Sequence, residues 1–393
     1  MGRVYEHVCC VSRAAGQAAG EEDHIDSIAV PTNGNAFTDR MRRTVTAPIW
    51  IVADDLTGAA DAALPFWRAG HRARVVLDPA APWPENPGVL SLCTYSRAMS
   101  ETAAAAALRA LAARLPRDGF VFKKIDSTLR GWIGAECVAL LDEGPQRAAI
   151  FAPAYPSKGR TLGPDGVYRV HGVPLAETEF APEITSLAAD STLPAFIAHH
   201  FGAHAPLVRV LAAQTDAELR AATASIDPSA LWIGSPGLAV ALAGPAVRPL
   251  LPSPPPMRER ALAIVIAVGS RRAVAQRQVE ALVAALSPGP LLLRPPDIPY
   301  DPVRAARIAD DLGARAAEAA CARGCGGLIL TGGDTAAATC RHLGLASAEI
   351  VGEVEDGLPV LRAGEFHLVT KAGGFGDDRS LVRAHARLAS FLV

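Results

Sequence analysis

Two adjacent carboxylates, Asp54 and Asp55, directly follow the apolar segment 49–53 and open the sequence Asp54-Asp-Leu-Thr57-Gly-Ala59. An Asp or a Thr at such a position can cap the helix that follows. One cap uses one side chain, so the second carboxylate is left for another task. Two acidic groups at a strand end suit a general base or a contact to Mg²⁺. Asp54 and Asp55 are therefore candidate catalytic residues, with helix capping as the alternative.

A second polar cluster, Lys123-Lys-Ile-Asp126-Ser-Thr-Leu-Arg130-Gly131, overlaps the end of a predicted strand at 120–125. Because side chains alternate along a strand, its two lysines are expected on opposite faces of the sheet. Lys, Asp, Ser and Arg in one short segment can bind an anion that carries hydroxyls, and Arg130 can hold a carboxylate through two parallel hydrogen bonds. The alternatives are a solvated loop, or a cap for the helix predicted from Ile133.

A third segment, Pro153-Ala-Tyr-Pro156-Ser-Lys-Gly159-Arg160, follows the apolar strand predicted at 148–152. The two prolines restrict the loop, and Arg160 offers a second group for binding an anion. Loops with proline and glycine are common, so this segment alone indicates little.

Glycine-rich turns follow three predicted strands in the second half of the chain. Gly332-Gly333-Asp334-Thr335 follows one strand, Gly269-Ser270 a second, and Thr370-Lys371-Ala-Gly373-Gly374-Phe-Gly376 a third. Glycine lets the backbone approach phosphate oxygens, and a helix N-terminus offers free N–H groups. One such turn indicates little, but three in one domain favour a nucleotide site.

Several common motifs are absent from the sequence. It contains no G-x-x-x-x-G-K-[ST], no G-x-G-x-x-G leading from a strand into a helix, and no H-E-x-x-H. His199, His200 and His204 have no carboxylate or cysteine near them in sequence, so we expect surface histidines rather than metal ligands. We therefore assign no metal-binding residues from the sequence.

Apolar segments alternate with helical segments along most of the chain. The predicted strands are 49–53, 74–77, 120–125, 148–152, 262–268, 290–293, 327–330 and 366–370, and the predicted helices are 58–68, 101–115, 133–141 and 336–343. This alternation predicts an α/β fold with two domains, each a mostly parallel sheet flanked by helices. In such sheets ligands bind just past the carboxyl ends of the strands, which is where the polar clusters lie.

Changes in composition suggest the domain boundaries. Residues 1–46 are polar and lack periodicity, so we expect a disordered extension, or residues upstream of a true start at Met41, and assign them no function. Residues 47–244 form the first predicted domain. Residues 245–257 contain Pro252-Ser-Pro-Pro-Pro256, which fits neither a helix nor a sheet and indicates a linker. Residues 258–393 form the second domain.

The overall composition argues against several classes of protein. Of the 393 residues 20% are charged and 5% aromatic, with a net charge of −2, which does not favour nucleic acid as a partner. The seven cysteines include no C-x-x-C pair, which favours reduced thiols. No apolar run approaches the roughly 18 residues of a membrane span, and we find no signal peptide. These features predict a soluble, cytoplasmic protein that does not contact membranes.

Taken together, the motifs beginning at Asp54, Lys124, Pro153, Gly332 and Lys371 resemble, in order, those of the four-carbon acid sugar kinase family. The resemblance runs from about Trp50 to the C-terminus. It implies ATP-dependent phosphorylation, with Mg²⁺, of the terminal hydroxyl of a small-molecule acid such as erythronate, threonate or 3-oxo-tetronate. It also implies that the first domain binds the sugar acid and the second binds ATP.

The motif positions then divide the candidate residues into two groups. The substrate candidates are Thr57, Lys124, Asp126, Ser127, Arg130 and Arg160. The ATP candidates are Ser270, Gly332, Gly333, Asp334, Thr335, Lys371, Gly373 and Gly374. In the implied mechanism, Asp54 or Asp55 accepts the proton of the attacking hydroxyl.

The sequence departs from the family pattern at a few positions of the nucleotide domain. Arg271 and Arg272 stand where the family often has Cys and Ser, and Asp334 stands where it often has Glu. Ala372 and Gly374 stand where Ser and Asn are common. These departures bear on nucleotide affinity and on the choice among substrates.

Two rival functions remain open at this point. One is an aldolase or phosphatase that uses the carboxylate pair on a phosphorylated sugar acid. The other is a non-enzymatic sugar-acid sensor, although no basic face supports it. ATP binding and turnover would separate them. The identity of the tetronate and the oligomeric state are also open, with a homodimer as one option.

Overall fold

The computed structural model describes residues 48–84, 88–117, 119–184, 192–224, 229–248, 264–286, 290–297, 301–323 and 325–392. The extension predicted at 1–46 lies outside these residues, as does the predicted linker from residue 249 onward. The first linker residues are described, and the backbone N–H groups of Val247 and Arg248 donate to the Arg68 carbonyl. These two residues therefore contact the first domain.

The first domain is built on a parallel sheet of order β2-β3-β1-β4-β10-β5-β9. Its strands are β1 (Ile49–Ala53), β2 (Ala73–Val76), β3 (Val89–Cys93), β4 (Phe120–Lys124), β5 (Ala149–Ala152), β9 (Val208–Val210) and β10 (Leu231–Gly234). Its helices are α2 (Leu56–Arg68), α3 (Glu101–Ala112), α4 (Ile133–Glu143), α5 (Leu193–Phe201), α6 (Asp216–Thr223) and α7 (Pro236–Ala243). A small antiparallel sheet of β6 (Arg160–Leu162), β7 (Tyr168–Val170) and β8 (Val173–Pro174) lies beside it.

The second domain contains parallel strands in the order β12-β11-β13-β16, extended by an antiparallel hairpin. Its strands are β11 (Ile264–Val268), β12 (Leu291–Leu293), β13 (Gly327–Thr331), β14 (Ser347–Glu355), β15 (Leu358–Ala363) and β16 (Phe366–Lys371). Its helices are α8 (Ala273–Ala285), α9 (Pro302–Arg323), α10 (Gly333–His342) and α11 (Ser380–Ala389). The predicted fold class, with mostly parallel sheets flanked by helices, is confirmed.

The two sheets are joined, which the sequence did not indicate. Strand β14 of the second domain pairs antiparallel with β2 of the first, with Ser347 opposite Val76 and Glu349 opposite Arg74. The result, in the described part of the chain, is one 13-stranded sheet that runs through both domains. A free strand edge leaves backbone N–H and C=O groups unpaired, so pairing the two edges satisfies both.

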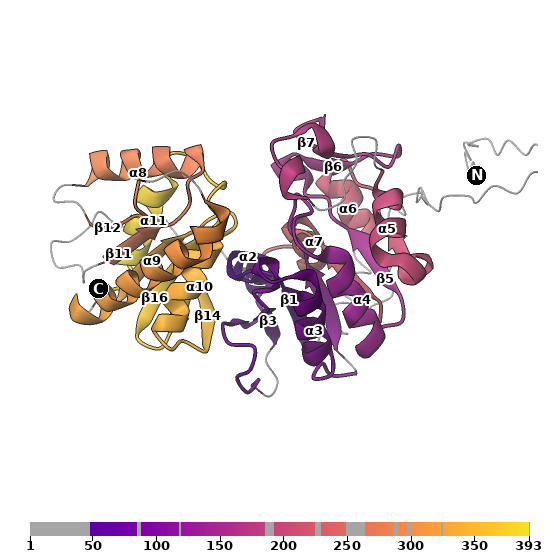
Figure 1. The fold of residues 1–393 in the computed structure, drawn as a ribbon, viewed down its shortest axis with the longest axis horizontal. Coiled ribbons are helices and arrows are strands. Elements are labelled where there is room, and N and C mark those ends of the chain that lie inside the picture. The colour runs from indigo at the N-terminus through magenta and orange to yellow at the C-terminus, as the bar shows by residue number, and fades with distance from the viewer. Residues whose placement is uncertain are drawn as a thin grey trace, which may run out of the picture.

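The central strands are apolar because helices cover both of their faces. All five residues of β1 and all five of β13 are buried. Helix α2 begins straight after β1 and lies where the two domains meet; in Figure 1 it is the indigo helix next to the orange part. Its apolar residues, from Leu56 to Phe66, are buried, and it also contacts α7 and α10. The turn that starts α2 is therefore held between the two domains.

The predicted element bounds are correct to within a few residues, with one difference that matters for the site. Helix α10 was expected to start at Ala336, but it starts at Gly333, inside the Gly332-to-Thr335 motif. Gly332 precedes it with φ of 100°, a conformation that L side chains rarely adopt. The free N–H groups of this helix therefore belong to the glycine motif itself.

Candidate active site

One cavity of about 760 Å³ lies between the two domains, at the carboxyl ends of their strands. Every candidate residue from the sequence lines it. From the first domain these are Asp54, Asp55, Thr57, Lys124, Asp126, Ser127, Arg130 and Arg160. From the second they are Ser270, Gly332, Gly333, Asp334, Thr335, Lys371, Gly373 and Gly374. The fold thus brings both groups to one space, while their individual roles stay predictions.

Asp55 is the residue that caps helix α2. Its Oδ1 accepts from the Gly58 N–H at 3.1 Å, and its Oδ2 accepts from the Thr57 hydroxyl at 2.6 Å. A Cβ at Gly58 would lie 2.4 Å from the Asp55 Oδ1, so the cap depends on glycine there. Asp55 remains open to the cavity, with 17% of its side chain exposed. Capping therefore fixes this carboxylate without removing it from the site.

Asp54 is held in a different way. Both of its oxygens accept from Arg97, from Nε and from Nη2, each at 2.8 Å, and only 4% of its side chain is exposed. Burial opposes ionisation of Asp54, yet the positive charges of Arg97 and Lys123 prevail and hold its pKa below the usual value. Its two oxygens are thus committed to a bidentate ion pair.

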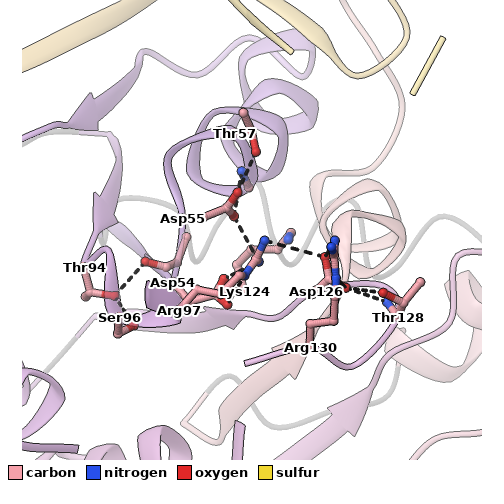
Figure 2. Close-up of polar contacts among 12 residues, drawn as sticks. Asp54, Asp55, Thr57, Thr94, Ser96, Arg97, Lys124, Asp126, Thr128 and Arg130 are labelled. Atoms are coloured by element: carbon pink, nitrogen blue, oxygen red, sulfur yellow. Dashed lines mark hydrogen bonds and ion pairs between the residues drawn. The ribbon is translucent and has the colours of Figure 1, made fainter. Parts of the chain in front are cut away.

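Arg97 connects three carboxylates and was not among the residues singled out from the sequence. It also donates to Asp55 Oδ1 at 3.1 Å, and its Nη1 lies 3.8 Å from Asp126 Oδ1. Figure 2 shows it between Asp54 and Asp126. Arg97 follows β3 by four residues, and β3 was missed in the sequence although Val89–Cys93 is fully buried. The rule that polar residues follow apolar strands would have found it.

The two adjacent lysines of β4 point to opposite faces, as predicted. The Lys123 Nζ pairs with Glu136 of α4 at 2.6 Å, and both side chains are almost fully buried. Lys124 lines the cavity, and its Nζ would lie 3.0 Å from a Cβ at Gly58, beside the start of α2. Lys123 is therefore part of the packing beneath the sheet, and Lys124 is the lysine available to a ligand.

Asp126 and Arg130 form the next ion pair along the chain. Arg130 donates from Nε to Asp126 Oδ2 at 2.9 Å and from Nη2 to Oδ1 at 2.8 Å (Figure 2). The Thr128 backbone N–H also donates to Asp126 Oδ2, at 3.0 Å. Burial would raise the pKa of Asp126, but Arg130 and Arg97 outweigh it and lower the pKa well below the usual value. Asp126 therefore orients Arg130.

Arg160 and Ser127 complete the cavity wall formed by the substrate candidates of the first domain, which we call the acid side. The Arg160 Nε is buried without a hydrogen-bond partner in the described structure, and burial lowers the pKa of this residue. A buried N–H group without a partner is costly, so it is suited to an anion that supplies the missing acceptor. The Ser127 carbonyl accepts from the Tyr168 hydroxyl at 3.0 Å, which ties this loop to β7.

The nucleotide-side loops fit closely against each other at their glycines. A Cβ at Gly373 would lie 1.9 Å from the Ser270 Oγ, so the loops after β16 and β11 can approach only because Gly373 has no side chain. Between them, after β13, lies the N-terminus of α10. Backbone amides and a helix N-terminus turned to one cavity form a suitable environment for phosphate groups.

Lys371 is the one buried cation among the predicted nucleotide residues. Its Nζ donates to the Ala372 carbonyl at 2.9 Å. Burial lowers its pKa to about 8, although the negative charge of Glu355 acts in the opposite direction. A second charged group, Asp334, faces the first domain. Desolvation, and after it the negative charge of Asp55, raises the pKa of Asp334.

The two halves of the site are close together at the start of α10. A Cβ at Gly333 would lie 3.2 Å from the Asp55 Oδ2 and 3.7 Å from the Thr57 Oγ1. Asp55, the more exposed carboxylate of the Asp54–Asp55 pair, therefore faces the helix N-terminus of the second domain. A phosphate at that N-terminus and a hydroxyl beside Asp55 would be neighbours.

Two further residues bear on the site. Asp61, one turn after Gly58, lines the cavity, and burial raises its pKa to about 7, an effect that Lys124 opposes. Asp61 was not singled out from the sequence, because it lies inside helix α2 rather than after a strand. His204, one of the three histidines expected at the surface, is partly exposed and pairs with Asp142 of α4 at 2.8 Å, a carboxylate distant in sequence.

The described residues contain no group of three or more His, Cys, Asp or Glu side chains arranged to hold a metal ion. Among the helices of these same residues, none is both long and apolar enough to span a bilayer.

Both halves of the chain match known protein families. Residues 49–233 match the family described as a sugar-binding N-terminal domain, and residues 298–381 match the family described as a nucleotide-binding C-terminal domain. The sugar-binding match precedes the nucleotide-binding match, just as the substrate candidates precede the ATP candidates along the chain.

Several characterised proteins are similar over most of their length. A D-threonate kinase of Bordetella bronchiseptica is 33% identical, covering 86% of this chain and 96% of its own. A D-threonate kinase of Cupriavidus necator is 30% identical, covering 85% and 96%. A D-erythronate kinase of Heliobacterium modesticaldum is 32% identical, covering 60% of each chain.

Two solved structures show that the fold is shared. A Salmonella typhimurium protein superposes with a TM-score of 0.67 at 21% identity, covering 87% of this chain and 99% of its own. A Haemophilus influenzae protein superposes with a TM-score of 0.62 at 20% identity, covering 86% and 100%. From the two domain matches and a 33% identical relative that covers 86% of this chain, the chain belongs to the four-carbon acid sugar kinase family.

Proposed function

We propose that this protein transfers the γ-phosphate of ATP to the terminal hydroxyl of a four-carbon sugar acid. The observation that carries the proposal is the position of Asp55. This residue caps helix α2 and faces the N-terminus of α10 across the domain boundary. Relatives named D-threonate kinase and D-erythronate kinase supply the substrate class.

The acceptor's carboxylate binds in the part of the cavity lined by Arg130 and Arg160. Arg160 supports this placement because its buried Nε has no partner among the residues that the structure describes, and a carboxylate oxygen would supply one. Arg130 is oriented by Asp126, so its guanidinium is positioned before the ligand arrives. The acceptor's hydroxyls bind Ser127 and Lys124, which line the same space.

Asp55 accepts the proton of the attacking hydroxyl. Of the two adjacent carboxylates it is the better candidate, because Asp54 has both oxygens bound by Arg97. The Thr57 hydroxyl and the Gly58 N–H hold Asp55 in one orientation. A carboxylate placed to receive the substrate's proton is a recurring part of enzymes that phosphorylate hydroxyls.

ATP binds to the second domain with its phosphates at the loops of Ser270, Gly332–Thr335 and Gly373. The free N–H groups of α10 point into the cavity there, and Lys371 adds a positive charge. In phosphoryl transfer most of the rate enhancement comes from positioning the reactants and neutralising charge. The loops and Lys371 would supply both of these effects.

Mg²⁺ accompanies ATP in this proposal. Magnesium prefers carboxylate and phosphate oxygens, and Asp334 is a carboxylate that lines the cavity beside the phosphate loops. Asp334 would hold the ion from the second domain together with the ATP phosphates. When bound, Mg²⁺ neutralises the negative charge of the phosphates.

The experiment is a substrate panel. The purified protein is incubated with ATP, Mg²⁺ and each of D- and L-erythronate, D- and L-threonate and their 3-oxo counterparts, and ADP is followed. We expect acid-dependent ADP from at least one of them, ranked by kcat/KM. Release of ADP that does not depend on any acid, or none at all, would contradict the proposal. A phosphatase or an aldolase would instead act without ATP.

Two further expectations from the sequence stay predictions, the cytoplasmic location and the homodimer. Cell fractionation and size-exclusion chromatography with light scattering test them.

A further inference from the structure

A single carboxylate links the acid-binding arginine to the nucleotide domain. Glu183, in the 3₁₀ turn Ala181–Glu183 of the first domain, accepts from Arg130 Nη1 through Oε2 at 3.0 Å. Its other oxygen, Oε1, accepts from Arg272 Nη2 at 2.6 Å. Arg272 precedes α8 in the second domain, and all three side chains line the cavity. Glu183 thus joins the two domains directly across the candidate active site.

The hydrogen-bond donors of Arg130 are largely committed to protein carboxylates. Its Nε and Nη2 donate to Asp126, which occupies one edge of the guanidinium, and its Nη1 donates to Glu183. A guanidinium holds a carboxylate best with two parallel hydrogen bonds from one edge. An incoming acid can therefore use Arg130 in that way only if one of the two carboxylates gives up its place.

Glu183 is the partner that can be displaced. Its side chain is 41% exposed and that of Asp126 is 12% exposed. Asp126 also accepts from the Thr128 backbone N–H and lies beside Arg97, so its position is fixed from several sides. Partly exposed ion pairs contribute little to stability, so a ligand can replace this one at little cost.

Glu183 is ionised in this position. Burial opposes ionisation, but the hydrogen bond and positive charge of Arg130, with those of Arg272, hold the pKa of Glu183 below its usual value. At neutral pH the residue is therefore a carboxylate on Arg130, which is the same chemical group that the proposed acceptor carries.

We propose that Glu183 sets the affinity for the acceptor by occupying Arg130 in place of the acceptor's carboxylate until that acid binds. This inference rests on the proposed function, because it concerns the acid site of the same reaction. On binding, the acid takes the Nη1 of Arg130, and Glu183 keeps its hydrogen bond to Arg272. Glu183 is a positioning residue that acts through Arg130 and does not touch the transferred group.

The test compares two conservative variants, Glu183→Gln and Glu179→Gln. Both remove one negative charge from the neighbourhood of Arg272, since Glu179 Oε2 lies 3.4 Å from Arg272 Nη1. Arg130 donates to Glu183 but has no such bond to Glu179 among the hydrogen bonds of the described residues. The pair therefore separates competition at Arg130 from a general change of charge. A melting curve for each variant verifies that it is folded.

For Glu183→Gln we expect the KM for the accepted tetronate to fall about threefold to fivefold, the size of one partly exposed ion pair, with kcat unchanged within about twofold. For Glu179→Gln we expect no change in that KM. The inhibition constant of the matching sugar alcohol, which lacks the carboxylate, should be the same in all three proteins. A KM for Glu183→Gln that equals or exceeds that of Glu179→Gln would overturn the inference.

Calorimetric titration with D-threonate, without nucleotide, makes the outcome independent of turnover. Tighter binding by Glu183→Gln than by the wild type and Glu179→Gln supports the inference even if no phosphoryl transfer is detected. Equal or weaker binding overturns it. A lack of ADP formation in the wild type with every tetronate is a failure of the proposed function, and the two failures are therefore distinguishable.

Discussion

The two sides of the cavity are built by different means. The acid side consists of charged side chains already joined in pairs, Asp54 with Arg97 and Asp126 with Arg130. The nucleotide side consists mainly of backbone, with glycine loops and the start of α10, and Lys371 as its buried cation. A small hydroxylated acid has to be told apart from similar molecules, which requires fixed side chains. The triphosphate is the same in every nucleoside triphosphate and can be held by backbone N–H groups.

This difference predicts how each side responds to mutation. On the acid side, a change of charge alters chemistry or stability, because the Asp54–Arg97 and Asp126–Arg130 pairs each contain a largely buried carboxylate. On the nucleotide side, added volume matters more than charge, because the loops touch through glycine. The predictions below are ordered from the largest expected effect to the smallest.

Asp55→Asn is expected to have the largest effect. Asparagine can still cap α2 but cannot take up a proton, so we expect kcat to fall by roughly 10²–10⁴-fold with little change in the melting temperature. Steady-state kinetics with the best tetronate provide the measurement. A variant that retained wild-type kcat would remove Asp55 from the role of base.

Asp54→Asn should chiefly affect stability. The change removes the bidentate partner of Arg97, which then keeps only its longer contacts to Asp55 and Asp126. We therefore expect the free energy of unfolding to fall by about 2 kcal/mol in urea denaturation. The control is Asp142→Asn, which breaks a partly exposed pair with His204 and should cost no more than about 0.5 kcal/mol. Equal losses for the two variants would show that the Asp54–Arg97 pair is not structural.

The acid side was mostly predictable from sequence because its residues directly follow apolar strands, and strand ends meet at one edge of a parallel sheet. Arg97 escaped because its strand, Val89–Cys93, was missed. The different roles of Asp54 and Asp55 could not be predicted either, because they depend on Arg97, a partner 42 residues away from Asp55. Adjacent positions in a sequence say nothing about which carboxylate is already paired.

Gly373→Ala tests the nucleotide side. Its Cβ would lie 1.9 Å from the Ser270 Oγ and force the two loops apart, so we expect the KM for ATP to rise about tenfold, or roughly 1.4 kcal/mol. Binding of the acid should be unchanged. The matched variant is Gly374→Ala, whose Cβ meets nothing within 4 Å and should raise the KM less. A larger effect at Gly374 would contradict the close contact at Gly373.

Lys371 should make nucleotide binding sensitive to pH. Burial lowers its pKa to about 8, so it is charged below that pH and neutral above it. We therefore expect the KM for ATP to rise about threefold between pH 7 and pH 9, as the attraction for phosphate is lost. Lys371→Arg stays charged over this range and should give a flat profile. A parallel rise in both proteins would assign the pH dependence to another group.

The nucleotide side was predictable in its motifs but not in its geometry. Three glycine turns after strands indicated phosphate binding, and all of them line the cavity. The pairing of β14 with β2, which joins the two sheets, could not be foreseen because it unites strands from the two domains. That Gly333 faces Asp55 is visible only in the folded chain, since it depends on how the domains meet.

The most direct test of the central claim is to identify the products of one reaction. The protein is incubated with ATP, Mg²⁺ and the preferred tetronate, and the mixture is followed by ³¹P NMR and mass spectrometry. The proposed transfer from the second domain to the first predicts equal amounts of ADP and of an acid phosphorylated on its terminal hydroxyl. ADP with inorganic phosphate alone, or an acid that stays unmodified, would contradict it.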